Sequence, residues 1–193
     1  AETIARDIQP FAVLGGPNLT EAFADTLAAN KIACVSCTPG QPNQWYINRA
    51  TYVWDIQKNT EQNLQMVAEY IGKRIAGRTA EYGGDDVNGK ERKLGLVALS
   101  TTPQSEELRQ GFLDDLEEQY DAEIAEIATY TDPVALAGQA GEMMAKMKSE
   151  GITTVIFYGD PLAPQTLSQN ATEQGFFPEW IMTGSALVHT TIF

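Results

Sequence analysis

Short apolar segments recur along this chain at a spacing that few folds accommodate. Segments rich in Ile, Val, Thr and Tyr begin near residues 93, 123, 153 and 180, and a helical pattern fills each gap. They are LGLVAL (94–99), EIAEIATY (123–130), TTVIFYG (153–159) and WIMTG (180–184). Parallel pairing needs a crossover of about a dozen or more residues, usually a helix. The spacing therefore predicts an α/β fold in which residues 93–184 form a parallel sheet with helices on both faces.

Capping residues and glycines are expected to mark the helix ends. A side-chain oxygen before the first turn accepts free backbone N–H groups, and glycine adopts the left-handed conformation that ends many helices. The predicted N-terminal caps are Thr102, Asp132 and the pair Asn59 and Gln62, and the predicted C-terminal glycines are Gly151 and Gly175.

The first third of the chain has a shorter rhythm. We expect strands at residues 11–14, 32–36 and 51–56, and a helix over residues 20–30 that joins the first two. Residues 77–92 are rich in glycine and charge, and they are predicted to form a solvated loop.

Both cysteines, Cys34 and Cys37, lie in a segment typical of a strand that ends at a Pro-Gly turn. In an extended strand their Cα atoms would lie roughly 10 Å apart, whereas a disulfide needs less than about 7 Å. A bridge between them requires the chain to leave the strand by Ser36. We therefore expect two structural thiols that are not bridged to each other, with a disulfide or a metal or redox site as the alternatives.

Composition excludes some classes of function. The chain has 13 basic and 26 acidic residues, a net charge of −13, whereas nucleic-acid binding needs a basic face. No apolar run approaches the length of about 18 residues that a transmembrane helix needs, and no signal-peptide pattern occurs. We expect no nucleic-acid partner and no membrane-spanning segment.

Recognisable catalytic chemistry is also missing from the sequence. The chain has no G-x-S-x-G, P-loop or G-x-G-x-x-G motif, and its one histidine, His189, argues against a Ser-His-Asp triad. Two cysteines and one histidine are fewer than the four ligands of a structural zinc site. We expect neither an enzyme nor a bound cofactor or metal.

The ordered set of segments carries a family resemblance. A strand ending in Gly-Gly with a polar turn and helix, FAVLGGPNLTEAFADTLAANK, is followed by IACVSCTPGQP and TYVWDIQKNTEQNLQMVAEYI. KLGLVALSTTPQSEELRQGFLDDL, TTVIFYGDPLAPQTLSQNATEQGF and EWIMTGSALVHTTIF come next. This order resembles the type I periplasmic solute-binding proteins, the branched-chain amino acid receptor-like group that serves ABC transporters. The similarity spans nearly the whole chain, although no single motif is specific.

The resemblance implies two Rossmann-like lobes with parallel sheets. Residues 1–56 would form part of lobe 1 and residues 57–193 most of lobe 2. Members of this family are near twice this length, so lobe 1 is expected to be incomplete and the chain to be a fragment. A hinge near Gln57 and Lys58 would close when a ligand contacts both lobes.

In this family the ligand is held by loops at the carboxyl ends of the strands, as the crevice rule for open α/β sheets also predicts. Amino-acid binders usually hold the carboxylate with hydroxyls and backbone N–H groups, and the amine with an acid, here Asp160. The implied ligand-binding residues are Asn18, Thr20 and Thr38 on one lobe and Gln104, Asp160 and Ser185 on the other. Gln104 replaces a common aromatic and Ser185 a common acid, which argues against a branched-chain amino acid ligand. Helix capping is the alternative role for such residues.

The function implied by the resemblance is the binding of a small polar solute, such as an amino acid, amide or small carboxylate. An ABC transporter permease would receive it, and the protein would be extracytoplasmic, either periplasmic or a cell-surface lipoprotein. The alternative is a ligand-sensing domain of the same fold in a receptor or repressor. A repressor core would be cytoplasmic and would follow a basic helix-turn-helix, which this sequence lacks. An α/β enzyme is the third and weakest hypothesis.

Overall fold

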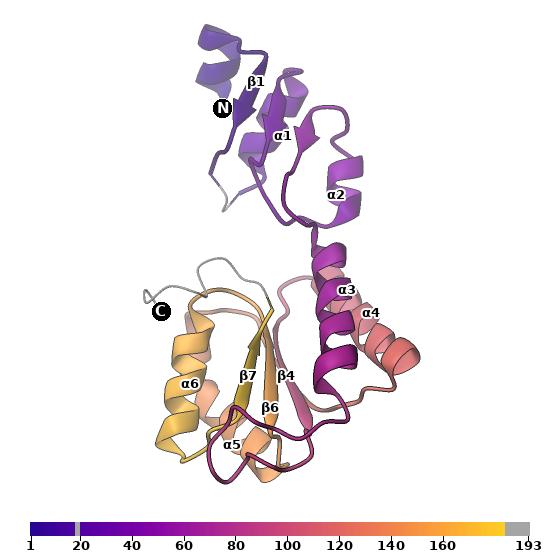
Figure 1. Ribbon diagram of the computed structural model, residues 1–193. Helices are drawn as coiled ribbons and strands as arrows, with labels where there is room; N and C mark the ends of the chain where they lie inside the picture. Colours follow the sequence, from indigo (N-terminus) through magenta and orange to yellow (C-terminus); the bar gives the residue numbers. More distant parts are fainter. Residues whose placement is uncertain (18–19, 184–193) are drawn as a thin grey trace. The chain divides into compact units, whose positions relative to one another are not determined.

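The chain divides into two compact units, Ala1–Leu64 and Gln65–Phe193. The computed structural model describes residues 1–17 and 20–183, and each unit combines a parallel sheet with helices (Figure 1). The division falls inside helix α3 (Thr60–Tyr70). The lobe boundary at residues 56 and 57 stays a prediction.

The first unit holds a three-stranded sheet in the order β1-β2-β3, with both pairings parallel. Its three strands lie within the predicted segments and are shorter than expected, and α2 is a short helix that the sequence did not predict. The elements are η1 (Ile4–Ile8, a π-helix), β1 (Ala12–Leu14), α1 (Ala22–Ala29), β2 (Ala33–Val35), α2 (Asn43–Ile47) and β3 (Val53–Trp54).

The second unit holds a four-stranded sheet in the order β5-β4-β6-β7. The pairs β4 with β5, β4 with β6 and β6 with β7 are all parallel, so the predicted parallel sheet is confirmed. Helices α5 and α6 lie on one side of this sheet and α3 and α4 on the other (Figure 1). The remaining elements are η2 (Ile71–Ile75), β4 (Leu94–Leu99), α4 (Pro103–Tyr120), β5 (Ile124–Tyr130), η3 (Ala135–Gly138), α5 (Ala140–Ser149), β6 (Thr154–Tyr158), α6 (Ala163–Glu173) and β7 (Glu179–Met182).

The helix ends follow the predicted caps. Thr102 accepts the backbone N–H of Ser105 ahead of α4, and Asn59 and Gln62 exchange hydrogen bonds ahead of α3. Gly151 after α5 and Gly175 after α6 have φ angles of +70° and +60°. These angles lie in the left-handed region that glycine adopts without a steric penalty.

One core cluster of the second unit lies between its sheet and helices α5 and α6. Met147, Phe157 and Leu167 are fully buried there. Gly95 on β4 faces α5 so closely that a Cβ atom would lie 2.6 Å from Met147 Sδ. A strand glycine of this kind permits close approach of a neighbouring element, so α5 packs directly on the sheet.

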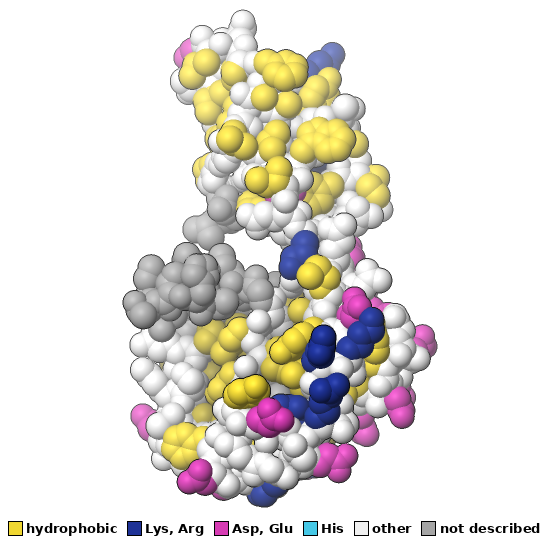
Figure 2. Space-filling model, viewed as in Figure 1, with side chains coloured by type: hydrophobic (Ala, Val, Ile, Leu, Met, Phe, Trp, Pro, Cys, Tyr) yellow, Lys and Arg dark blue, Asp and Glu magenta, His cyan; other side chains and the backbone are white. Residues whose placement is uncertain are grey.

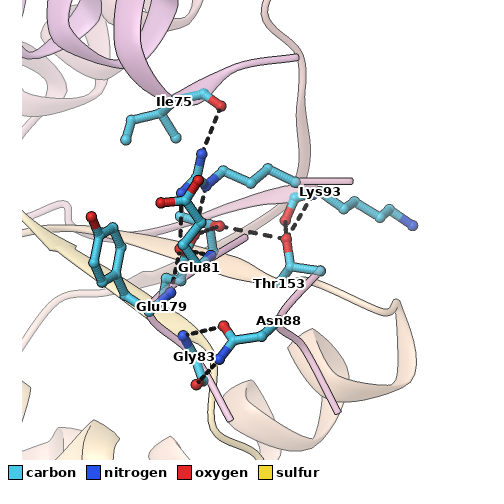
Figure 3. A network of polar contacts seen from close by, with 10 residues as sticks. Ile75, Glu81, Gly83, Asn88, Lys93, Thr153 and Glu179 are labelled. Atoms are coloured by element: carbon cyan, nitrogen blue, oxygen red, sulfur yellow. Dashed lines mark hydrogen bonds and ion pairs between the residues drawn. The ribbon is translucent and has the colours of Figure 1, made fainter. Parts of the chain in front are cut away.

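Residues 77–92 form the predicted loop, and most of them are exposed, but two of its side chains are buried. Ala80 and Val87 are only 1% and 4% exposed. The carboxylate of Glu179 on β7 accepts the N–H groups of Glu81 (2.7 Å) and Tyr82 (2.9 Å) and pairs with Arg92. Figure 3 shows Glu179 and Glu81 within this polar network. The sequence did not predict this anchor, because the acceptor is an acid nearly 100 positions later in the chain.

Large apolar side chains are exposed on the first unit (Figure 2). Phe11 and Leu14 beside β1 are 92% and 79% exposed, and Trp54 and Ile56 beside β3 are 57% and 79% exposed. Among the described strands, β1 and β3 are the two edges of this sheet.

Candidate functional site

The order of the second sheet locates a switch point. Chain connections run from β4 toward β5 in one direction and from β6 toward β7 in the other, so the strand order reverses between β4 and β6. Ligands of open α/β sheets bind outside the carboxyl ends of the strands at such a point. The loops at these ends begin at Ser100 after β4 and at Gly159 after β6. Gln104 and Asp160 of the predicted set lie in or directly after these loops.

Asp160 is held in place by both of its carboxylate oxygens. Oδ1 accepts the N–H groups of Leu162 (2.8 Å) and Ala163 (3.1 Å) at the start of α6, and Oδ2 accepts the hydroxyl of Tyr130 (2.5 Å). Burial, together with the adjacent Asp160 carboxylate, raises the pKa of Tyr130 far above its ordinary value. Asp160 is therefore a fixed acceptor that also caps a helix at the switch point.

The segment after β4 is organised by a capping box. Thr102 Oγ1 accepts the Ser105 N–H (3.1 Å), and Ser105 Oγ accepts the Thr102 N–H (3.0 Å). Gln104 lies in the first turn of α4 with an exposed side chain. The structure thus gives Thr102 the capping role and leaves the Gln104 amide at the surface.

In the first unit, Asp55 at the end of β3 gathers the neighbouring loop. Its oxygens accept the hydroxyls of Ser36 (3.1 Å) and Tyr46 (2.8 Å) and the N–H of Gly40 (2.9 Å). Burial opposes its ionisation, but these hydrogen bonds and the Gln57 N–H outweigh burial and hold the pKa of Asp55 below its usual value. Burial and Asp55 raise the pKa of Tyr46 to about 12. Asp55 is therefore ionised and Tyr46 neutral at neutral pH.

Thr38 lies inside this loop and has an unusual environment. The residue is 3% exposed, and its hydroxyl has no hydrogen-bond partner among residues 1–17 and 20–183. Buried polar groups in proteins are nearly always paired, and leaving one unpaired destabilises the fold by about 1–3 kcal/mol. Thr38 Oγ1 is thus a hydrogen-bonding group at the carboxyl end of β2 that no described residue satisfies.

Cys34 and Cys37 form a disulfide, which corrects the expectation of two unbridged thiols. Strand β2 ends at Val35, and Ser36 takes a left-handed φ of +54°. This turn brings the two Cα atoms to 5.8 Å, within the range that a disulfide spans. The sequence prediction assumed an extended backbone from Cys34 to Cys37, but the strand ends at Val35. The disulfide fixes the start of the loop that carries Thr38.

The other predicted residues are less informative. Thr20 is exposed, and its hydroxyl accepts the N–H of Ala22 (3.2 Å) at the start of α1. Asn18, Ser185 and His189 lie outside the described residues. The structure therefore brings Thr38 beside a defined polar cluster in the first unit and places Asp160 and Gln104 near the switch point of the second.

Sequence reasoning missed Asp55, Tyr46 and Tyr130. Asp55 carries a detectable signal, because an acid that directly follows a strand of a parallel sheet lies at the carboxyl edge. Tyr46 belongs to a five-residue helix whose pattern is too short to detect, and Tyr130 is indistinguishable in sequence from a strand residue.

A hollow of about 310 Å³ lies beside this cluster in the first unit. Its walls come from α2, β3 and the start of α3, and they combine Ile47, Val53 and Trp54 with side-chain amides such as Gln57. This volume is near the lower end for small-molecule pockets. Within residues 1–17 and 20–183, no cluster of three or more His, Cys, Asp or Glu residues is placed to hold a metal ion. No described helix is long and apolar enough to cross a membrane.

Comparison with known proteins relies on the fold. No family model matches the sequence, and no curated protein matches it. Solved structures do match: LivJ, the branched-chain amino acid transporter substrate-binding protein of Streptococcus pneumoniae in complex with isoleucine, superposes with a TM-score of 0.63 at 14% identity. The fold is that of type I periplasmic binding proteins.

Two further structures share this fold. An ABC transporter solute-binding protein of Rhodopseudomonas palustris in complex with 4-hydroxybenzoate gives a TM-score of 0.62 at 12% identity. An ABC transporter substrate-binding protein of Desulfitobacterium hafniense in complex with Leu gives 0.63 at 12% identity. The three alignments cover 92%, 90% and 93% of this chain but only 45%, 42% and 48% of the matched chains. The chain thus spans less than half of the length of the proteins whose fold it shares.

Proposed function

We propose that this chain belongs to a non-enzymatic extracytoplasmic protein that binds a small polar solute and delivers it to an ABC transporter permease. The observation that carries the proposal is the buried Thr38 hydroxyl at the carboxyl end of β2, which has no partner among the described residues. In a fold whose ligands meet the carboxyl ends of strands, a hydroxyl left in this state is suited to bond a solute.

The chemistry of the solute follows from the donors on offer. The ligands named for the three matched structures, isoleucine, 4-hydroxybenzoate and leucine, share a carboxylate. A threonine hydroxyl donates one hydrogen bond to such an oxygen, which supports Thr38, with Thr20 and Asn18, as the carboxylate side of the site. Asp160, a fixed carboxylate, suits an ammonium or amide group, with Gln104 and Ser185 beside it in the proposed set. An amino acid, an amide or a small carboxylate is the solute class that these residues support.

The disulfide supports the extracytoplasmic location. Cys34 and Cys37 form a disulfide. Disulfides persist in oxidising compartments, whereas cytoplasmic proteins keep most thiols reduced. The same bridge argues against the cytoplasmic repressor core as an alternative role for this fold.

The test is calorimetry of the full-length natural protein with L-isoleucine, L-leucine, 4-hydroxybenzoate, other amino acids and their amides. Thr38→Val deletes the hydroxyl and keeps the shape. It should weaken binding by about 1–3 kcal/mol, because the solute loses a buried partner. The same variant should be at least as stable as the wild type, because an unpaired buried hydroxyl no longer destabilises the free protein.

Thr26→Val is the matched control. Its hydroxyl donates to the Ala22 carbonyl one turn earlier in α1 (2.7 Å), and the residue is half-buried. We expect its dissociation constant to stay within about twofold of the wild type, since the site is untouched. If solutes bind and Thr38→Val binds them as tightly as the control does, Thr38 is not a ligand residue. If the full-length protein binds none of the panel, the proposed function is wrong.

A further inference from the structure

The loop that carries Thr38 is fixed on both sides by one carboxylate. Ser36 Oγ donates to Asp55 Oδ1 (3.1 Å), and the Gly40 N–H donates to Oδ2 (2.9 Å). Thr38 lies midway between these two contacts in the sequence. A side chain that holds positions 36 and 40 together therefore restricts the backbone of Thr38 without touching its hydroxyl.

Asp55 is also well placed to act as a rigid anchor. Its Oδ1 accepts the N–H groups of Ile56 (2.7 Å) and Gln57 (3.0 Å) at the end of β3. The Tyr46 hydroxyl donates to its Oδ2 (2.8 Å) and accepts the Gln41 N–H (3.2 Å), which extends the network to the residue after Gly40. Five donors converge on one carboxylate, so its orientation is fixed by the sheet on one side and by α2 on the other.

The loop itself needs such an anchor. Ser36 has a φ of +54° and Gly40 a φ of +77°. A positive φ is uncommon for a residue other than glycine and persists where surrounding contacts enforce it. The Cys34–Cys37 bridge restrains the backbone around Ser36, and Asp55 restrains both Ser36 and Gly40.

We propose that Asp55 is a positioning residue for solute binding: its carboxylate sets the conformation of residues 36–40 and thereby the place of the Thr38 hydroxyl. The solute-binding half of this inference rests on the proposed function. The loop-positioning half does not, so the two can be tested separately.

The first experiment measures the loop without any solute. One set of donors bonds Asp55 Oδ1 and another set, which includes the Gly40 N–H, bonds Oδ2. In Asp55→Asn one of these oxygens becomes an NH2 donor, so one set loses its acceptor. Amide hydrogen exchange of Gly40 and Gln41, followed by NMR in the full-length protein, should accelerate by about tenfold, the factor that corresponds to losing one hydrogen bond to a charged group. Amides of α1 should keep their wild-type rates. Unchanged exchange at Gly40 and Gln41 would overturn the positioning role.

The second experiment is a double-mutant cycle on solute affinity. Asp55→Asn should raise the dissociation constant for the panel member that binds by about tenfold in the wild-type background, and by less than about twofold in a Thr38→Val background. Equal factors in both backgrounds would show that Asp55 does not act through Thr38. If Asp55→Asn lowers overall stability, Ser36→Ala can replace it in the cycle, because it removes a single donor to Asp55. Its effect on the dissociation constant should be smaller and should also depend on the Thr38 hydroxyl.

Asp25→Asn is the matched control, because Asp25 is an acid of the same unit that pairs with Arg49 (2.6 Å) and not with residues 36–40. We expect no change in exchange at Gly40 and no change in affinity. If the wild type binds solute and Asp55→Asn matches this control, the inference fails and the proposed function stands. If the wild type binds no solute, the proposed function fails, and the exchange experiment still decides whether Asp55 positions the loop.

Discussion

Removing the charge of Glu179 should destabilise the second unit strongly. This carboxylate accepts the N–H groups of Glu81 and Tyr82, the Thr154 hydroxyl (2.6 Å) and two guanidinium donors of Arg92 (2.7 and 2.9 Å). The Arg92 and Glu179 side chains are only 4% and 6% exposed. Glu179→Gln keeps the shape but turns one acceptor into a donor that faces other donors, and it leaves Arg92 buried without its counter-charge.

The magnitude follows from burial and from the pKa of the carboxyl group. Removing one partner of a buried ion pair costs about 3–5 kcal/mol, because the remaining charge is uncompensated. Burial alone would raise the pKa of Glu179, but Arg92 and the other donors lower it from 4.5 to about 2. That difference corresponds to about 3 kcal/mol, so both estimates predict a loss near this size.

The assay can isolate the second unit, because Trp180 is its one tryptophan while Trp45 and Trp54 belong to the first unit. In a Trp45→Phe/Trp54→Phe background, urea denaturation followed by tryptophan fluorescence gives the free energy of unfolding around β7. The pH dependence gives a second measure. The pKa of Glu179 is lowered on folding, so its contribution is complete above pH 4.5 and is lost as the pH falls toward 2. The stability difference between wild type and Glu179→Gln should shrink over that range.

Glu69→Gln is the matched control. Glu69 pairs with Lys73 one turn later in η2 (2.5 Å), and both side chains are more than half exposed. An exposed pair of this kind contributes little to stability, because water screens both charges. If Glu179→Gln and Glu69→Gln lower the unfolding free energy equally at pH 7, the argument that Glu179 anchors residues 77–92 is refuted.

Two further changes test other contacts. Replacing both Cys34 and Cys37 with Ser should lower the unfolding free energy of the first unit by about 2 kcal/mol, the loop-entropy value for so short a loop, measured by Trp45 fluorescence; an unchanged midpoint in urea would contradict this. Tyr130→Phe removes the hydroxyl that donates to Asp160 (2.5 Å) and should cost the second unit about 1.5–3 kcal/mol in thermal or urea unfolding. A smaller loss than that caused by Tyr120→Phe, at the half-buried last residue of α4, would count against this bond.

The second unit was the more predictable from sequence, for a physical reason. Its two central strands, β4 and β6, are mostly apolar and buried on both faces, and β4 (Leu94–Leu99) coincides with the predicted LGLVAL segment. The short strands of the first unit have less apolar sequence to mark their ends. The Cys34–Cys37 prediction failed there because a single left-handed residue, Ser36, ends the strand earlier than the apolar pattern suggests.

The features that the sequence did not predict depend mainly on contacts between residues far apart in the chain. Residues 77–92 have the composition of a solvated loop, and the distant Glu179 carboxylate adds to the local hydrogen bonds that order their backbone. Within the candidate site, Thr38 was predictable from its place after a strand, but its unpaired hydroxyl was not. The hydrogen bonds that Tyr46 and Gly40 donate to Asp55 could not be predicted either, because neither residue belongs to a recognisable sequence pattern.

The Tyr130 to Asp160 hydrogen bond gives this protein a natural spectroscopic probe. It joins the ends of β5 and β6, which are two strand spacings apart, roughly 10 Å, because β4 lies between them. The tyrosine side chain therefore spans the end of β4. A hydroxyl proton that is buried and held by a carboxylate exchanges slowly with water, so its NMR resonance should be visible apart from the amide signals. That single resonance would report any change at the carboxyl edge of the sheet without an attached label.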